Sequence, residues 1–549
     1  MKKNQFFGLR IVAAFKFAVL VTVIAATGIF GSVTATAQSS TLPAAAREAG
    51  KAYELVVLHT NDHHGTTVSK DGLMGLAERA TFVKRVQGEN KNVLILDAGD
   101  INMGTALSNM FDAEPDIKAY NMIGYKAAAF GNHEFDKPLS VLDKQIELAD
   151  FDFVNANITR KNGAYLDKPY VIVDYDGFRV AVIGLTTLRT RVTARPDASL
   201  KWAKEIDAAK KTIADVRKKE NPDIVILLGH LGDVLETDDQ TTSVKLCEAL
   251  AKAKIKVDLV VDGHSHSNLQ KPIIVGGIPI VSSWEWGKNV GKANLTIVDG
   301  AVTEFKWQPV KIDSKTYPPD AAVIAMLAPY IQKSNASLKE VVMKTAAEFP
   351  FKKGNTDRIS RFQESEAGDL VCDSYTWYLK NNFDIACDFA ITNGGNIRSA
   401  LPAGDVTREA IKTMMPFDNW VYMLKLNGSD VKALFEHVAS QNQGAGGFAQ
   451  VSKEVKYTIT YDEKGGNGKI SGITISGKPI NDKTIYTIAT NDYMADGGDG
   501  YIVFKNKRLD FFNTSMLVSD ILIDYAKTFK EPVKPSLDGR ITIVGGSAK

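Results

Sequence analysis

The chain is poor in cysteine, with only Cys247, Cys372 and Cys387 among 549 residues. Three cysteines are too few for a disulfide scaffold, so the fold must depend on a hydrophobic core. A hydrophobic content of 44% suits a globular protein of two or more domains. Cys372 and Cys387 are the only tempting pair, but a helix of about nine residues between them would separate them by roughly 13 Å. We expect them to remain unpaired.

The chain also lacks a surplus of charge of either sign. It has 66 Lys and Arg against 64 Asp and Glu, a formal net charge of +2. Residues 1–37 hold four basic residues (Lys2, Lys3, Arg10 and Lys16) and no acidic one, so the remainder has 62 against 64. The slight basicity therefore belongs to the leader, and nothing indicates a surface for nucleic acid polymers.

Long hydrophobic runs are missing after the leader. Residues 1–37 combine a basic start, an apolar run near 17–30 and Ala35-Thr36-Ala37 before Gln38, which predicts a cleaved signal peptide. The alternative is an uncleaved membrane anchor. No cysteine near the cleavage point could carry a lipid, and no later run approaches the length of about 20 residues that a membrane span requires. We expect a soluble periplasmic or secreted protein without a stable membrane anchor.

The rest of the chain divides into two halves. Residues 53–317 alternate short apolar runs with amphipathic helices, which predicts a layered α/β domain. Pro318-Pro319-Asp320 then begins a predicted connecting helix over 318–342. Residues 343–549 form a second half without any metal-binding motif.

Histidine is the informative residue in the first half. Seven of the eight histidines lie at or just past the ends of apolar strand-like runs, and only His437 lies in a helical pattern, where we interpret it as structural. The central stretch is 131–136, where an amide, an imidazole and two carboxylates follow the run 127–130. The carboxyl ends of strands in an open α/β sheet share one crevice, so distant segments can converge there. Two Asp, one Asn and four His in one crevice suffice for two metal ions with one bridging carboxylate. These candidate ligands are Asp62, His64, Asp100, Asn132, His230, His264 and His266.

Four segments stand out in the second half: Arg358–Phe362, Ile391–Arg398, Met415–Asn419 and Asn491–Gly500. Taken singly, each has an ordinary explanation, because glycine pairs make turns and an exposed Arg is usually solvated.

Taken together, the metal segments and these four segments resemble the secreted 5′-nucleotidase / UDP-sugar hydrolase family over residues 53–545. That resemblance implies an α/β protein. Its N-terminal calcineurin-like metallophosphatase β-sandwich is flanked by helices, and a smaller C-terminal α/β domain binds nucleotide. One metal would be held by Asp62, His64, Asp100 and His266, and the second by Asp100, Asn132, His230 and His264. His133 would be the catalytic histidine, oriented by Asp136. One departure is His266, where the family often has Gln or Asn.

The resemblance also implies a substrate site. Phe417 and Tyr493 would sandwich the base, and Asp499 would accept hydrogen bonds from the ribose hydroxyls. Arg361, Asn393 and Arg398 would meet the phosphate and sugar. Aromatic faces stack on any base and Arg suits phosphate oxygens, so the residue types agree with these roles.

The implied enzyme is a metal-dependent phosphoric monoester hydrolase, a 5′-nucleotidase. It would convert nucleoside 5′-monophosphates, and other nucleotides as well, to nucleoside and phosphate. A hydroxide held by two divalent metals (Zn, Mn or Co) would attack phosphorus in line. Three alternatives stay open: a 2′,3′-cyclic nucleotide phosphodiesterase/3′-nucleotidase, a UDP-sugar hydrolase, and a non-catalytic periplasmic nucleotide-binding protein. Oligomeric state and base preference also stay open.

Overall fold

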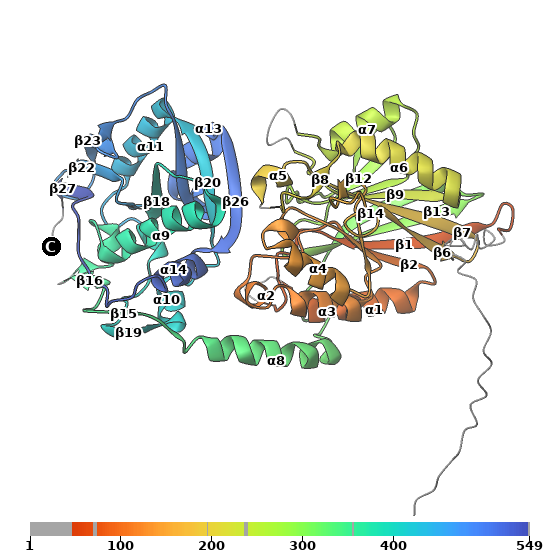
Figure 1. The fold of residues 1–549 in the computed structure, drawn as a ribbon, viewed down its shortest axis with the longest axis horizontal. Helices are drawn as coiled ribbons and strands as arrows, with labels where there is room; N and C mark the ends of the chain where they lie inside the picture. The colour runs from red at the N-terminus through yellow and green to blue at the C-terminus, as the bar shows by residue number, and fades with distance from the viewer. Residues whose placement is uncertain (1–46, 70–73, 195, 235–239, 354–355, 547–549) are drawn as a thin grey trace, which may run out of the picture. The chain divides into compact units, whose positions relative to one another are not determined.

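The computed structural model describes residues 47–69, 74–194, 196–234, 240–353 and 356–546 (Figure 1). The predicted signal peptide, residues 1–37, lies outside these ranges. Within them, no helix is both long enough and apolar enough to cross a membrane.

Two six-stranded sheets form the first domain. The first contains, in spatial order, β14 (Ala301–Lys311), β13 (Asn289–Val298), β1 (Ala52–Thr60), β2 (Val93–Asp97), β3 (Ala127–Ala129) and β4 (Asp152–Val154). The second contains β11 (Ile273–Val275), β12 (Ile278–Val281), β10 (Leu259–Asp262), β9 (Ile224–His230), β7 (Phe178–Thr186) and β6 (Tyr170–Tyr175). Strands β1 to β4 run parallel, as do β7, β9, β10 and β12.

Alternate residues of these strands face different cores. In β1, Leu55 and Val57 join a core shared with residues of the second sheet, such as Ile226 of β9. Val56 and Leu58 face the other way and pack with helix residues. Strand side chains alternate between faces, so each sheet is covered by the other sheet on one side and by helices on the other (Figure 1). The outer helices include α1 (Leu76–Glu89), α3 (Glu114–Ile123), α4 (Leu139–Leu148), α6 (Glu205–Glu220) and α7 (Ser243–Lys252). The predicted layered α/β class is confirmed.

The connecting helix is shorter than the 318–342 predicted. Helix α8 spans Ala321–Ser337, and strand β15 already begins at Val341. The Asp320 carboxylate caps α8 by accepting from the backbone N–H groups of Ala322 and Val323. Pro318 and Pro319 thus precede the helix.

The second domain contains a five-stranded and a four-stranded sheet. The larger has the order β21 (Ala449–Val451), β18 (Phe389–Asn393), β25 (Ile485–Asn491), β20 (Trp420–Asn427) and β26 (Asp510–Leu517). The smaller has the order β24 (Lys478–Pro479), β23 (Lys469–Ile475), β22 (Val455–Tyr461) and β27 (Ile541–Gly545). Helices α9 (Glu366–Phe383) and α14 (Val518–Ala526) pack on one face of the larger sheet, and α11 (Gly428–Ser440) packs on the other.

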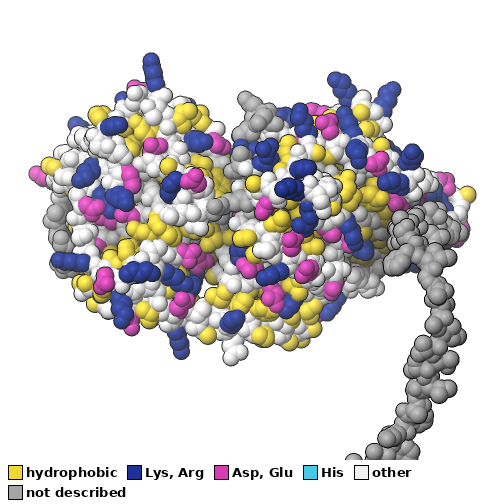
Figure 2. Space-filling model, in the orientation of Figure 1, with side chains coloured by type: hydrophobic (Ala, Val, Ile, Leu, Met, Phe, Trp, Pro, Cys, Tyr) yellow, Lys and Arg dark blue, Asp and Glu magenta, His cyan; other side chains and the backbone are white. Residues whose placement is uncertain are grey.

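The cysteines remain unpaired, as we expected from the sequence. All three cysteines are free, and Cys372 is buried in α9. Figure 2 shows acidic and basic side chains interspersed over the visible face, without a continuous basic area.

Candidate dimetal centre

The predicted ligands come from turns at the carboxyl ends of five parallel strands. β1 leads into 61–65, β2 into 98–100, β3 into 130–133, β9 ends at His230, and β10 leads into 263–266. Five of the seven ligands are non-glycine residues with positive φ: Asp62 (49°), His64 (48°), Asp100 (58°), His264 (83°) and His266 (51°). Non-glycine residues rarely adopt this conformation, and such strain clusters at functional sites.

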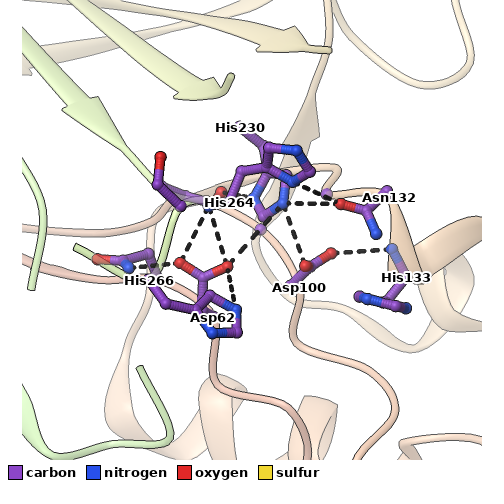
Figure 3. A network of polar contacts seen from close by, with 12 residues as sticks. Asp62, Asp100, Asn132, His133, His230, His264 and His266 are labelled. Carbon is purple, nitrogen blue, oxygen red and sulfur yellow. Dashed lines mark hydrogen bonds and ion pairs between the residues drawn. The ribbon is translucent and has the colours of Figure 1, made fainter. Parts of the chain in front are cut away.

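One group of side chains gathers around Asp62. His266 Nε2 lies 3.4 Å from Asp62 Oδ1 (Figure 3). His64 Nε2 lies 3.0 Å from His266 Nε2. The ligating atoms of these three residues lie within 4.8 Å of one another, a spacing that one metal ion can span. Asp62 and His64 are buried.

A second group gathers around Asn132. Its Oδ1 lies 2.8 Å from His264 Nδ1 and 3.2 Å from His230 Nε2 (Figure 3). Asp100 joins the two groups, because its Oδ2 lies 3.1 Å from His230 Nε2 and 3.8 Å from His64 Nε2. The structure therefore brings all seven predicted ligands together.

The imidazoles are already oriented as metal ligands require. His230 Nδ1–H donates to the Ala98 carbonyl (2.8 Å), and His64 Nδ1–H donates to the Met103 carbonyl (3.1 Å). Each ring thus directs Nε2, the atom that would ligate a metal, toward the carboxylates. A ligating His typically fixes its outer nitrogen in this way. The buried oxygen and imidazole donors fit divalent transition metals, with no thiolate in the set.

Glu285 fixes the outer ring nitrogen of His266 in the same way. Its Oε2 lies 2.5 Å from His266 Nδ1, and its Oε1 pairs with Lys288 Nζ at 2.6 Å. Lys288 Nζ also lies 4.1 Å from the ring centroid of Trp284 and 4.3 Å from that of Trp286. Glu285 was not predicted from the sequence, although its position after β12, between Trp284 and Trp286, is a usable signal.

Glu134 is a second residue that the sequence analysis left without a role. Its carboxylate accepts four backbone N–H groups: Asp100 (2.9 Å), Ile101 (2.9 Å), Asn102 (3.1 Å) and Gly131 (2.6 Å). It thus fastens the turn after β2 to the turn after β3, which fixes the bridging Asp100 beside Asn132.

His133 lies at the edge of the centre. Its Nδ1 is 2.5 Å from Asp136 Oδ2, the contact expected of an orienting carboxylate. Burial by itself would lower the pKa of His133, but the Asp136 and Asp100 carboxylates outweigh it and raise that pKa to about 9. Its Nε2 lies 2.8 Å from Ser515 Oγ of β26, a residue that sequence reasoning did not find.

Electrostatics in the centre follow from its two buried carboxylates. Burial alone would lower the pKa of His230, yet Asp100 and Asp62 raise it to about 10. The carboxylates therefore stabilise positive charge strongly at this point, as a site for divalent cations should.

The six predicted substrate residues lie close together in the second domain. Asn393 Nδ2 donates to Asp499 Oδ2 (2.9 Å), and Tyr493 Oη donates to Asp499 Oδ1 (3.1 Å). The Arg398 guanidinium lies 5.4 Å from the ring centroid of Phe417. Burial lowers the pKa of Arg361, and the charges of Arg358 and Arg398 lower it further, so these cations are neighbours.

The two aromatic rings are unusually exposed. Phe417 is 43% exposed and Tyr493 46%. A cleft of about 480 Å³ beside the dimetal centre is lined from the second domain by residues such as Asp492, Asp496 and Arg508, and neither exposed ring belongs to its lining.

Comparison with known proteins identifies the class of protein to which this chain belongs. Residues 55–268 match the calcineurin-like phosphoesterase family model, and residues 341–506 match that of the 5′-nucleotidase C-terminal domain. The 5′-nucleotidase of Vibrio cholerae is 32% identical over 530 residues, which cover 88% of this chain and 92% of that protein. Protein UshA of Escherichia coli is 32% identical over 528 residues, with coverages of 88% and 92%. The NAD nucleotidase of Haemophilus influenzae shares the fold, with a TM-score of 0.69, 22% identity and coverages of 90% and 100%.

This chain therefore belongs to the 5′-nucleotidase family of two-domain metallophosphatases. It is a hydrolase, and its family implies divalent metal ions.

Proposed function

We propose that the protein hydrolyses nucleoside 5′-monophosphates to nucleosides and phosphate. The observation that carries this proposal is the pair of exposed rings, Phe417 beside Arg398 and Tyr493 beside Asp499, in a chain that also contains the candidate dimetal centre. A general phosphatase has no need of an exposed aromatic pair, whereas a purine or pyrimidine gains about 1–3 kcal/mol from stacking on one such ring.

The proposed metal ligands divide into two sets that share Asp100. Asp62, His64 and His266 would complete the first with Asp100, and Asn132, His230 and His264 the second. When bound, two divalent ions supply Lewis-acid stabilisation of phosphoryl charge and a water that is nucleophilic at neutral pH. The donor set suits Zn, Mn or Co.

The protein's own groups supply orientation and charge. His133 would stabilise negative charge on the phosphoryl oxygens and the leaving 5′-oxygen through Nε2–H, while Asp136 fixes Nδ1. Asp499 would accept from the ribose hydroxyls. Arg361, Asn393 and Arg398 would hold the phosphate and sugar, because guanidinium groups form strong charge-assisted hydrogen bonds to such oxygens.

His133 must be released before it can act. Its Nε2 faces Ser515, and the cleft beside the proposed metal ligands is lined by neither exposed ring. We therefore propose that the second domain turns during the reaction, so that the nucleotide site replaces Ser515 at the dimetal centre.

The test is a Phe417→Ala variant assayed on AMP and on p-nitrophenyl phosphate, with Mn²⁺ present. We expect KM for AMP to rise roughly tenfold to a hundredfold, with a much smaller change on the aryl phosphate, because stacking remote from phosphorus acts mainly on binding. Ile485→Ala is the control, since Ile485 is 53% exposed but lies outside the site. Equal losses on both substrates in a folded variant would reject the nucleotide assignment. The same assay on 2′,3′-cyclic AMP and UDP-glucose tests the alternative substrates.

Export is also part of the proposal. The leader 1–37 would direct the chain out of the cytoplasm and be removed before Gln38. N-terminal sequencing of the protein from the culture medium or periplasm should give Gln38 as the first residue, and an intact leader would contradict this.

A further inference from the structure

A cluster of carboxylates in the second domain lies outside the sites described above. Glu364 precedes α9, Asp369 lies in the first turns of α9, and Asp538 lies just before β27. One carboxylate oxygen from each lies within 4.8 Å of the others. Arg540 and Asp373 adjoin the cluster.

Glu364 holds the chain that leads into β27. Its Oε1 accepts the backbone N–H groups of Asp538 and Gly539 at 3.0 Å each, and its Oε2 accepts that of Ile541 at 2.8 Å. Three backbone N–H groups thus fix the position of this carboxylate. Glu364 is therefore a fixed negative charge at the floor of the cluster, where it is 4% exposed.

Asp369 is the unusual member. It too is 4% exposed, and neither of its carboxylate oxygens receives a hydrogen bond from any described residue. A buried carboxylate needs a compensating partner to carry its charge, and no described residue supplies one through a hydrogen bond. Its oxygen points toward those of Glu364 and Asp538, as their mutual spacing shows.

Arg540 does not satisfy Asp369. Its nearest approach is Nε at 3.6 Å from Oδ1, beyond a hydrogen bond. Its five N–H groups have other acceptors: Nε and Nη2 donate to Asp538 Oδ2, Nη1 and Nη2 to the two oxygens of Asp373, and Nη1 also to the Val451 carbonyl. The guanidinium is fully engaged.

Charge remains unbalanced as well. Four carboxylates (Glu364, Asp369, Asp373 and Asp538) surround this one guanidinium. Lys456 Nζ lies 3.4 Å from the main-chain oxygen of Asp538, so it adds one cation but bonds no carboxylate. Even when Asp369 is left out of the count, the three other carboxylates outnumber the two cations, Arg540 and Lys456.

We propose that Glu364, Asp369 and Asp538 bind one hard divalent cation of the calcium type. The donors are all oxygen, without imidazole or thiolate, which selects Ca²⁺ or Mg²⁺ over the transition metals of the first domain. Ca²⁺ accepts irregular ligand geometry at 2.3–2.6 Å, whereas Mg²⁺ demands a near-ideal octahedron. The Asp538 side chain is 49% exposed, which leaves a path for the ion and room for water ligands.

The ion would fasten α9 to β27. Glu364 precedes α9, Asp369 lies in its first turn, and Asp538 lies in the segment that enters the small sheet, so one ion would link segments about 170 residues apart in sequence. Occupancy should therefore raise the melting temperature through preferential binding to the folded state.

The test is calcium titration of the purified, Mn²⁺-loaded protein by isothermal calorimetry and by thermal unfolding. We expect one Ca²⁺ per chain, with Kd of about 0.1–1 mM as in extracellular calcium modules, and a rise in Tm. Asp369→Asn keeps the size of the side chain and should weaken Ca²⁺ binding more than tenfold. Asp538→Asn, at a half-exposed position that tolerates change, should also weaken it.

Asp100→Asn serves as the matched control for the first domain. It disrupts the dimetal centre and should leave Ca²⁺ binding and the Tm rise intact, so the two sites are distinguishable. The proposal is overturned if the wild type binds no Ca²⁺ up to 10-fold above the expected Kd, if Asp369→Asn and Asp538→Asn bind it normally, or if Asp100→Asn abolishes binding. Preference for Mg²⁺ over Ca²⁺ would overturn the ion class.

Discussion

Glu134→Gln tests whether one buried carboxylate holds the dimetal centre together. Glu134 is 2% exposed and accepts four backbone N–H groups, three from the turn 100–102 and one from Gly131. Each of the two carboxylate oxygens accepts two of these four hydrogen bonds. Glutamine has the same shape but only one acceptor oxygen, so its NH2 group must face two N–H donors.

The expected cost follows from this count. Burial, and then the charge of Asp100, raise the pKa of Glu134 to about 7, so the carboxylate is charged above that pH. Hydrogen bonds to a charged group contribute about 1.5–3 kcal/mol each, and two of the four are lost, which gives about 3–6 kcal/mol above pH 7. The remaining two bonds also weaken, because the acceptor is no longer charged. Asp100, at φ 58°, depends on this support, so the turn should relax and carry the bridging carboxylate out of position.

The assay combines urea unfolding of the first domain with elemental analysis of bound metal. We expect a large drop in unfolding free energy and substoichiometric metal in Glu134→Gln. Glu205→Gln is the matched control, since Glu205 is also 2% exposed and accepts the backbone N–H of Leu188 (2.7 Å) away from the centre. It should lose less stability and keep its metal. Full metal content in a destabilised Glu134→Gln would show that Glu134 does not position Asp100 for metal binding. Unchanged stability would show that its four hydrogen bonds do not stabilise the fold as calculated.

Three further predictions concern the centre and its surroundings. Asp100→Asn should lose metal and nearly all turnover, whereas Asp136→Asn should keep metal and lose rate; full metal in Asp100→Asn by elemental analysis would contradict the bridging assignment. A disulfide from Asn109→Cys and Met516→Cys, whose side chains touch at 3.9 Å between Nδ2 and Sδ, should suppress AMP hydrolysis until it is reduced, and undiminished activity in the oxidised form would argue against domain turning. Burial lowers the pKa of His59 to about 3, against 6.5 when unfolded. The unfolded state therefore binds a proton at a higher pH than the folded state does. The free energy of unfolding is thus fully retained above pH 6.5 and decreases as pH falls toward 3. Between pH 6.5 and 5 the wild type should lose about 2 kcal/mol more unfolding free energy than His59→Gln, and parallel pH profiles in urea unfolding would disprove it.

The convergence of the proposed ligands was predictable because they follow the ends of apolar strand-like runs in the sequence. Runs such as 224–228 are apolar throughout and therefore identify buried parallel strands. Parallel strands end at one edge, so His230 and His264 could be placed together from the sequence alone. The substrate residues were different: isolated motifs such as Met415–Asn419 carry no such rule, and only the family resemblance gave them roles.

The supporting residues could not be predicted because their partners are remote in sequence. Glu134 binds N–H groups more than thirty positions away, and Ser515 meets His133 across 382 positions. No local pattern encodes such contacts. The length of the connecting helix was also missed, since nothing in the composition of 338–342 distinguishes the end of α8 from the start of β15.

Asp100 shows why an isosteric change should abolish the centre. Its two oxygens have separate tasks: Oδ1 accepts the His133 backbone N–H at 2.8 Å, and Oδ2 faces His230 and His64. Asparagine can keep the first task only by directing its NH2 group toward the imidazoles, where a donor replaces the shared acceptor. The opposite rotamer restores an acceptor but sets NH2 against the His133 N–H. Either way the amide loses one contact that the carboxylate makes, and the contact facing the imidazoles is the one that two metal ions would share.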